Sequence, residues 1–164
     1  MTQHSGKLRN MASIYLLHEN KILLLYRQGN SIVRNLWIGS AGGHFEEAEV
    51  NDARHCVLRE LKEEINLDPD VLAGLQLRYI TLRYTDGEIR QNYYFFAELS
   101  TKHIPALAST EGICQWFSLT ELSDLPMPFT ARHMIDHYLA EGQFTDHLYA
   151  GIADNQQVTF CALS

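Results

Sequence analysis

The sequence is poor in the features that mark secreted, membrane-bound and nucleic-acid-binding proteins. Its three cysteines among 164 residues are widely spaced, without a CxxC pair, and so indicate reduced thiols rather than a disulfide framework. No apolar run is long enough for a signal peptide or a membrane span. A formal charge of -7 argues against a nucleic-acid polymer as partner, because such binding requires a basic surface. We therefore expect a cytoplasmic protein that binds neither nucleic-acid polymers nor membranes.

The composition, with 46% hydrophobic and 20% charged residues, is that of a globular protein. At this length we expect a single domain over residues 1–164. Neither repeats nor a linker interrupt the chain, and the oligomeric state, including a homodimer, stays open. The acidic balance does not exclude a small phosphorylated substrate, because a bound metal ion can invert the local charge.

Strand and helix patterns alternate along the chain and predict a mixed α+β domain. We expect two strands around a polar turn at His18–Lys21, and two longer ones around the strong turn signal Asp86-Gly87. The segment 28–43 reads as a loop anchored by Trp37. Further predicted elements are a short strand over 114–119, a second helix over 129–142 and a closing hairpin around Asp154-Asn155.

The first predicted helix begins after Asn51 or Asp52, either of which is a good N-cap, and runs to about Ile65. Asn66 suits the left-handed position that follows a helix, and Pro69 prevents continuation. The two ends of this helix are therefore well marked.

This helix carries three glutamates, Glu60, Glu63 and Glu64, within about a 100° arc of its surface. Like charges at this spacing repel, so either solvent or a bound cation must compensate them. An ordinary solvated face is the simpler interpretation. The small residues Ala53 and Cys56 on the same face weaken it, because they allow backbone to approach closely.

A glycine pair, Gly42-Gly43, can supply that backbone, including carbonyl oxygens aimed at the helix. Mg²⁺ prefers hard oxygen ligands, typically a few carboxylates together with water and substrate phosphate. Arg59 lies four residues before Glu63 and can orient its carboxylate. The pattern therefore favours a magnesium site made from the three glutamates and a Gly42 carbonyl.

The stretch from Gly42 to Leu67 resembles the signature of the Nudix hydrolases, Gx5Ex7REUxEExGU, in which U is a bulky aliphatic residue. Its second half matches at Arg59, Glu60, Leu61, Glu63, Glu64 and Leu67, and its first half at Gly43 and Glu49. There are two departures. The stretch between Glu49 and Arg59 is two residues too long, which leaves the role of Glu49 open, and Asn66 replaces a glycine. Glu46, Glu47 and Glu49 are therefore interpreted as a solvated approach to the helix.

The resemblance implies an α/β/α sandwich on a mixed sheet and a loop–helix–loop that hydrolyses a nucleoside diphosphate linked to another moiety, X. It implies Mg²⁺ as cofactor, with Mn²⁺ as a substitute. Glu60 and Glu64 would be inner ligands, and Glu63 would share that shell or act through water. A further carboxylate, as ligand or general base, would come from Glu111 in a segment similar to MutT-type enzymes, with Glu98 as the weaker rival.

The end of the chain resembles the oxidised purine nucleoside triphosphatases, which makes 8-oxo-dGTP a first expected substrate. The base-reading side chains of that group are missing, because Ile38 replaces an asparagine and Pro128, Phe129 and Thr130 stand where aspartates follow a Trp-Pro. ADP-ribose or a nucleotide sugar is the alternative substrate. A catalytically silent nucleotide sensor or protein-binding module is the alternative of a different class, although such a module has no reason to keep a repulsive glutamate triad.

Substrate contacts are expected from Arg27, Trp37, Gly43 and Phe129. For each aromatic residue, core packing is a strong competing interpretation. Arg83, Tyr84 and Arg90 flank the Asp86-Gly87 turn and could line a nucleotide pocket, although strand alternation makes most of them plain sheet residues. The spacing of His133 and His137 does not suggest zinc, and Cys56 lacks a basic activating group.

Overall fold

The computed structural model describes residues 4, 6–27, 35–100 and 107–164. Its nine strands are β1 (Leu8–His18), β2 (Lys21–Arg27), β3 (Trp37–Ile38), β4 (Ala41–His44), β5 (Leu72–Thr85), β6 (Glu88–Leu99), β7 (Gly112–Ser118), β8 (Tyr149–Ala153) and β9 (Val158–Ala162). Its helices are α1 (Ala53–Ile65) and α2 (Phe129–Ala140), with the 3-10 turns η1 (Glu47–Glu49), η2 (Pro69–Val71), η3 (Leu119–Glu121) and η4 (Gly142–Phe144).

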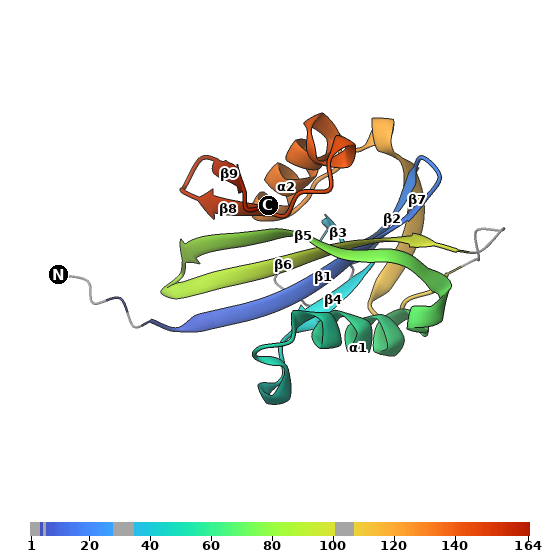
Figure 1. Ribbon diagram of the computed structural model, residues 1–164, viewed down its shortest axis with the longest axis horizontal. Helices are drawn as coiled ribbons and strands as arrows, with labels where there is room; N and C mark the ends of the chain where they lie inside the picture. Colours follow the sequence, from blue (N-terminus) through green and yellow to red (C-terminus); the bar gives the residue numbers. More distant parts are fainter. Residues whose placement is uncertain (1–3, 5, 28–34, 101–106) are drawn as a thin grey trace.

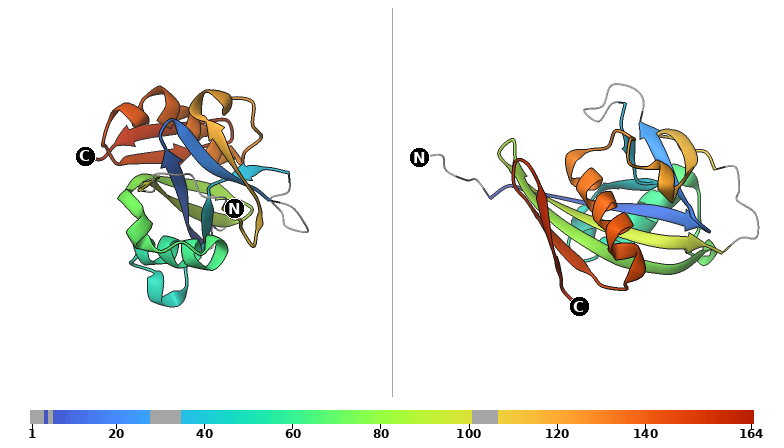
Figure 2. Two further views of the ribbon diagram at one scale, coloured as in Figure 1. Left: turned by 90° about the vertical axis from the view of Figure 1, so that its right-hand side faces the viewer. Right: turned by 90° about the horizontal axis from the view of Figure 1, so that it is seen from above.

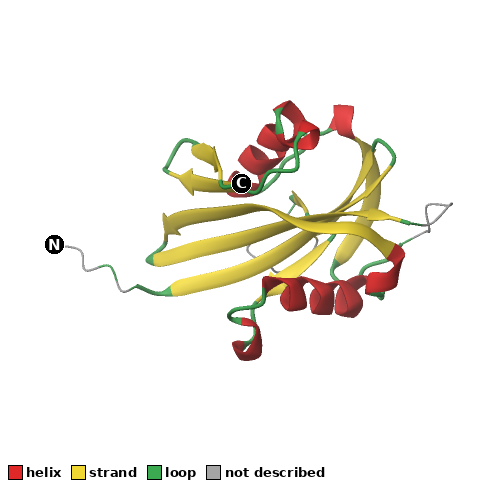
Figure 3. Cartoon of the chain, in the orientation of Figure 1, coloured by secondary structure: helices red, strands yellow, loops and turns green. Residues whose placement is uncertain are grey.

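The strands form one mixed sheet in the order β3-β2-β1-β6-β5-β8-β9, and in addition β4 pairs with β1 and β7 pairs with β2. β1 runs parallel to β6, and β5 runs parallel to β8, whereas the other pairs are antiparallel. α1 covers one face of the sheet and α2 the other (Figures 1 and 3), as the side view in Figure 2 also shows. The predicted α/β/α architecture is confirmed. In the described part of the chain, no helix is long and apolar enough to cross a membrane.

Local signals place the turns and the helix ends. Asp86 and Gly87 both adopt positive φ angles, 53° and 76°, which is the geometry of the tight hairpin between β5 and β6. The Asp52 carboxylate caps α1 by accepting a hydrogen bond from the His55 N–H at 3.0 Å. Asn66 ends the helix in the left-handed conformation, with φ 61°. These predicted features are confirmed.

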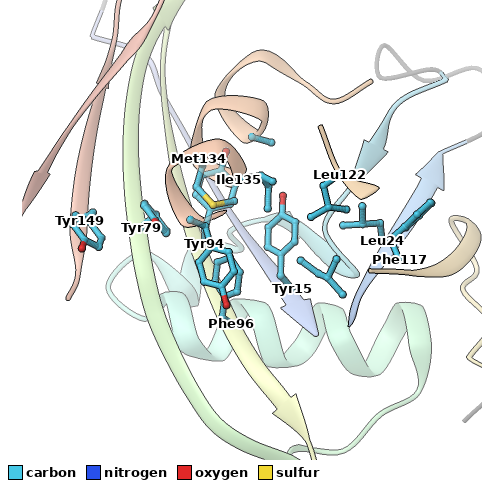
Figure 4. Close-up of a cluster of buried hydrophobic side chains, with 13 residues drawn as sticks. Tyr15, Leu24, Tyr79, Tyr94, Phe96, Phe117, Leu122, Met134, Ile135 and Tyr149 are labelled. Atoms are coloured by element: carbon cyan, nitrogen blue, oxygen red, sulfur yellow. The ribbon is translucent and has the colours of Figure 1, made fainter. Parts of the chain in front are cut away.

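Each face of the sheet has its own apolar core. On the α2 side, Tyr15 of β1 and Phe96 of β6 stack at a ring distance of 5.2 Å, and Phe96 stacks on Tyr138 of α2 at 4.4 Å (Figure 4). On the α1 side, Val57 and Leu61 are fully buried against strand residues. Neighbouring residues of β1 and β6 alternate between these cores, which assigns the two faces of these strands, whereas β5 has register shifts at Ala73/Gln76 and Leu77/Tyr79.

The interpretation of residues 28–43 as a loop was partly wrong. Residues 28–34 lie outside the described part of the chain, but β3 and β4 are short strands. β4 pairs with β1 from Ile14↔Ala41 to Met11↔His44. Glycine has a low strand propensity, so the sequence did not indicate this strand, and pairing with β1 determines it.

Candidate functional site

The carboxylates of Glu60 and Glu64 lie against β4. A side chain at Gly43 would collide with the Glu60 carboxyl group, so the absence of a Cβ atom creates the space that Glu60 occupies. The Gly42 N–H donates to Glu64 Oε2 at 3.3 Å. The predicted approach of the glycine pair to the acidic helix is therefore present in the structure.

None of the described groups that shift the pKa of the Glu64 carboxyl group is positively charged. Its pKa is raised from 4.5 to about 8, mainly by burial and in addition by the negative charges of Glu60 and Glu111, against the opposing hydrogen bond from Gly42. A carboxyl group with this pKa gains strongly from a nearby cation, because a cation favours the charged form.

Arg59 organises the acidic residues around it. Its guanidinium group donates from Nε and Nη2 to the two Glu49 oxygens at 2.9 and 2.8 Å, in a bidentate pair. Nη1 donates to Glu60 Oε1 at 2.9 Å and to Glu63 Oε2 at 3.1 Å. Arg59 therefore holds the Glu60 oxygen that also lies nearest to Gly43, whereas the Glu63 side chain remains 58% exposed.

The interpretation of Glu49 as part of a solvated approach was wrong. Its side chain is 1% exposed, and hydrogen bonds from Arg59 lower its pKa from 4.5 to about 2. Glu49 also accepts from the Glu46 N–H at 2.9 Å and lies 2.7 Å from His55 Nδ1. The longer spacing therefore still lets Glu49 reach Arg59. The Gly43-to-Glu49 spacing was the signal that could have identified this residue.

Glu111 approaches the same site from the turn before β7. Arg27 Nη2 of β2 lies 3.6 Å from Glu111 Oε2, so this pair brings two predicted site residues together. At the end of α1 the Thr110 N–H donates to the Glu64 carbonyl oxygen at 3.1 Å and fixes this turn against the helix. Glu98 lies on β6, where burial raises its pKa and the charge of His18 opposes that effect.

The two aromatic candidates have different surroundings. The ring of Trp37 contacts Phe117 edge-on at 4.7 Å and Tyr26 at 5.0 Å, which is a packing role at the margin of the α2-side core. Phe129, the first residue of α2, is partly exposed, and the Arg83 guanidinium lies 4.3 Å above its ring. The His133 ring lies 4.6 Å from the Phe129 ring as well, so both aromatic candidates are partly buried and already in contact with neighbouring side chains.

The cysteine and histidine alternatives have structural explanations. Burial raises the pKa of the Cys56 thiol to about 12, so it stays protonated, and Sγ lies 3.8 Å from the Gly43 carbonyl oxygen. His137 Nδ1 hydrogen-bonds the Tyr79 hydroxyl at 2.8 Å, and His133 Nδ1 lies 3.0 Å from the Phe129 carbonyl oxygen. These contacts give the two histidines a structural role on α2. The glutamates of α1 are therefore the candidate groups for chemistry.

The residues present fit a hard divalent cation that retains water. Within the residues that the structure describes, no three acidic, histidine or cysteine side chains form a complete metal cage. Glu60 and Glu64 instead provide two neighbouring carboxylates, with Glu111 close enough to raise the pKa of Glu64. Mg²⁺ is commonly held by one or two carboxylates, with water and substrate phosphate completing the octahedron.

Comparison with known proteins agrees with this geometry. The family model of the NUDIX domain matches residues 7–138. No curated protein matches the chain. Solved structures of similar fold include the mutator MutT protein from Bacillus halodurans, with a TM-score of 0.66 and 21% identity over 94% of this chain and 97% of that one.

Two further similar structures have different substrates in their names. The Caenorhabditis elegans Ap4A hydrolase has a TM-score of 0.65 and 16% identity over 84% of this chain and 99% of that one. The Escherichia coli dihydroneopterin triphosphate pyrophosphohydrolase has a TM-score of 0.60 and 20% identity over 81% and 94%. At these identities the similarity concerns the fold, whereas the family match covers most of the sequence. The chain therefore belongs to the NUDIX domain family and is a Nudix hydrolase.

Proposed function

We propose that the protein is a Mg²⁺-dependent pyrophosphohydrolase that cleaves a diphosphate bond in a nucleotide. Nudix hydrolases generally use divalent metal ions and act on small nucleotide substrates. The observation that supports this proposal most directly is the carboxylate pair of Glu60 and Glu64, which packs against Gly42-Gly43. The pKa of Glu64 is strongly raised in this position. We further propose that residues 1–164 act as one domain in the cytoplasm.

The proposed roles follow from the contacts. Glu60 and Glu64 would hold Mg²⁺ together with a Gly42 carbonyl oxygen, and Glu63 would act through water because its side chain is mostly exposed. The bound cation would neutralise the diphosphate and lower the pKa of its attacking water. Arg59 would hold Glu60 in place through its hydrogen bond at 2.9 Å.

The bond changes require one proton acceptor. The water oxygen forms a bond to phosphorus, the bridging phosphorus–oxygen bond breaks, and the proton of the water passes to a carboxylate. We propose Glu111 as this base or as a further metal ligand, because it lies close enough to affect the charge of Glu64. Arg27, at 3.6 Å from Glu111, would contact substrate phosphate.

A nucleoside triphosphate is the proposed substrate, with 8-oxo-dGTP as one member to test. Phe129, which is partly exposed and contacts Arg83 and His133, would be the stacking partner of the base. Ile38 offers no side-chain hydrogen bond, so selection for an oxidised base would need other groups. ADP-ribose or a nucleotide sugar is the alternative of the same reaction class.

A silent binding module is the alternative of a different class. It predicts that the protein hydrolyses no compound, and that replacing a carboxylate of the site changes no hydrolysis rate. A panel of canonical and oxidised nucleotides, nucleotide sugars and dinucleoside polyphosphates, incubated with Mg²⁺, separates these proposals. The variants are Glu60→Gln, Glu63→Gln and Glu64→Gln, and the control is Glu47→Gln, an exposed residue of η1.

The proposal predicts that at least one compound is hydrolysed and that Glu64→Gln lowers kcat/KM by about 100-fold or more. Glu47→Gln should retain wild-type turnover, because this residue lies outside the carboxylate cluster. If the wild type and Glu64→Gln hydrolyse every compound at the same rate, the enzymatic role of this site is refuted.

A further inference from the structure

The sheet extends beyond α1, and this extension has an apolar face. α1 packs on β1 and β4, and in Figures 1 and 3 the strands β1, β5 and β6 continue well past the N-terminal end of this helix, with β8 and β9 beside them. We call the α1 side of residues 8–10, 80–84, 89–91, 150–152 and 159–161 the open face. Apart from η1 at its margin, no helix that the structure describes lies on this face.

The first row of the open face consists of residues that are in register across three strands. Leu8 of β1 is opposite Ile89 of β6, which in turn is opposite Tyr84 of β5. In-register residues of neighbouring strands point to the same side of a sheet. Tyr93, four residues after Ile89 in the same strand, contacts the α1-side core, so this row lies on the α1 side. Its two outer members, Leu8 and Tyr84, are exposed large apolar residues.

The second row of the open face continues to the edge of the sheet. Leu82 of β5 is opposite Ile152 of β8, and Ile152 is opposite Thr159 of β9. Tyr149, three residues before Ile152, lies in the α2-side core, so Ile152 points to the α1 side. Ile152 is 56% exposed, and Cys161, two residues after Thr159, is exposed as well. The open face therefore extends from β1 to β9.

Among the residues that the structure describes, none on the open face is charged. The charged residues of the same strand segments occupy the alternate positions, which point to the α2 side: Arg9, Arg83, Glu88 and Arg90. A sheet face that borders water normally carries polar and charged side chains, whereas apolar side chains face a packed core. The alternation of residues in this part of the sheet is therefore that of a face packed against another surface.

The open face has the size of an interface centre. Neighbouring strands lie about 4.8 Å apart and same-face residues about 6.8 Å apart, so the open face covers roughly 350 Å² as a flat area. A stable interface uses about 800 Å² of each partner, with an apolar centre and a polar rim. Glu46 and Glu47 of η1 line a hollow beside Leu8 and provide polar groups at the margin. The open face with this margin therefore has the composition of a protein–protein interface.

We propose that two copies of the chain bind each other through their open faces, across a two-fold axis. Near such an axis each side chain lies close to its own copy, so a charged residue there would face a like charge. An uncharged face meets this condition, in a chain whose net charge of -7 opposes self-association elsewhere on the surface. Sheets that stack face to face lie about 10 Å apart with interdigitated side chains, which suits the apolar rows of the open face.

Sedimentation equilibrium of the full chain tests this proposal without any substrate. The wild type is compared with Ile152→Lys and with Leu8→Lys, one variant in each row, at concentrations from about 1 to 100 μM. In a dimer, either variant would bury an unpaired ammonium group in each copy. Ile113→Lys is the matched control, because Ile113 is an isoleucine of β7 that is 51% exposed and lies outside the open face.

The wild type should reach about twice the chain mass of 18.8 kDa, with a Kd of about 10 μM or lower. Ile152→Lys and Leu8→Lys should each raise this Kd about 100-fold or more, whereas Ile113→Lys should dimerise as the wild type does. A wild type that stays monomeric at about 100 μM overturns the proposal. So does a dimer that survives both open-face variants, or that the control variant disrupts equally.

Folding of each variant is checked by its circular dichroism spectrum. Ile152 and Leu8 are both exposed, so a lysine at either position should leave the spectrum unchanged, and if one variant does not fold, the other decides. The outcomes also separate this proposal from the catalytic one. A dimer that hydrolyses no panel compound refutes the catalytic proposal alone, whereas hydrolysis by a monomeric wild type refutes the interface alone.

Discussion

The ion pair between Glu49 of η1 and Arg59 of α1 allows a strong test of what fixes η1 against the helix. Glu49→Gln removes the charge from a side chain that is 1% exposed and leaves the guanidinium group without its bidentate partner. Breaking a buried ion pair on one side typically costs 3–5 kcal/mol. Arg59 keeps Glu60 and Glu63, so we expect the lower end, about 3 kcal/mol.

For a chain of 164 residues this loss corresponds to a Tm decrease of about 6–12 °C. Thermal unfolding followed by circular dichroism measures it, with Glu47→Gln as the control. The exposed Glu47 carries the same charge but forms no ion pair with any residue that the structure describes, and its replacement should shift Tm by less than about 2 °C. Equal Tm values for wild type and Glu49→Gln would refute the structural role of this pair.

The same pair predicts a pH dependence. The pKa of Glu49 is lowered from 4.5 to about 2, so the folded state favours its charged form. The stabilisation is complete above pH 4.5 and is lost as the pH falls from 4.5 towards 2. The Tm difference between wild type and Glu49→Gln should therefore narrow over this interval. A difference that stays constant from pH 6 to the acid limit of folding contradicts the assigned cause.

Three further predictions concern the glycine loop, the helix end and the metal. Gly43→Ala should lower kcat/KM about 100-fold, measured on the best compound of the panel, because the new Cβ displaces the Glu60 carboxylate; unchanged turnover contradicts this. Asn66→Gly should leave Tm nearly unchanged, whereas Asn66→Val should lower the free energy of unfolding by about 1–2 kcal/mol in a denaturant titration, because φ is 61°. Apparent Mg²⁺ affinity measured by calorimetry should rise as the pH increases towards 8, because the ion must displace the proton of Glu64; a pH-independent affinity opposes the assignment.

Features that depend on neighbouring residues were predictable from the sequence. The Asp52 cap, the left-handed Asn66 and the Asp86-Gly87 hairpin each follow from a few residues and their backbone preferences. The two helices and the long hairpin were therefore predicted correctly, as was the mixed α/β/α architecture.

Features that depend on distant pairing were not predictable. β4 exists because Gly42 and Gly43 pair with β1, although glycines give no strand signal. Glu49 is buried because Arg59, ten residues later, turns back to it across the longer loop. The parallel register of β1 with β6, which places Arg9 beside Arg90, is likewise specified by no local pattern.

The central claim is that Glu60 and Glu64 form half of a metal site. Mn²⁺ titration followed by electron paramagnetic resonance measures ion binding directly, independently of any substrate. Glu64→Gln should weaken Mn²⁺ binding by about tenfold or more relative to the wild type, because it removes a charged oxygen ligand, whereas Glu47→Gln should bind as the wild type does. Equal Mn²⁺ affinity in the wild type and Glu64→Gln would contradict the account.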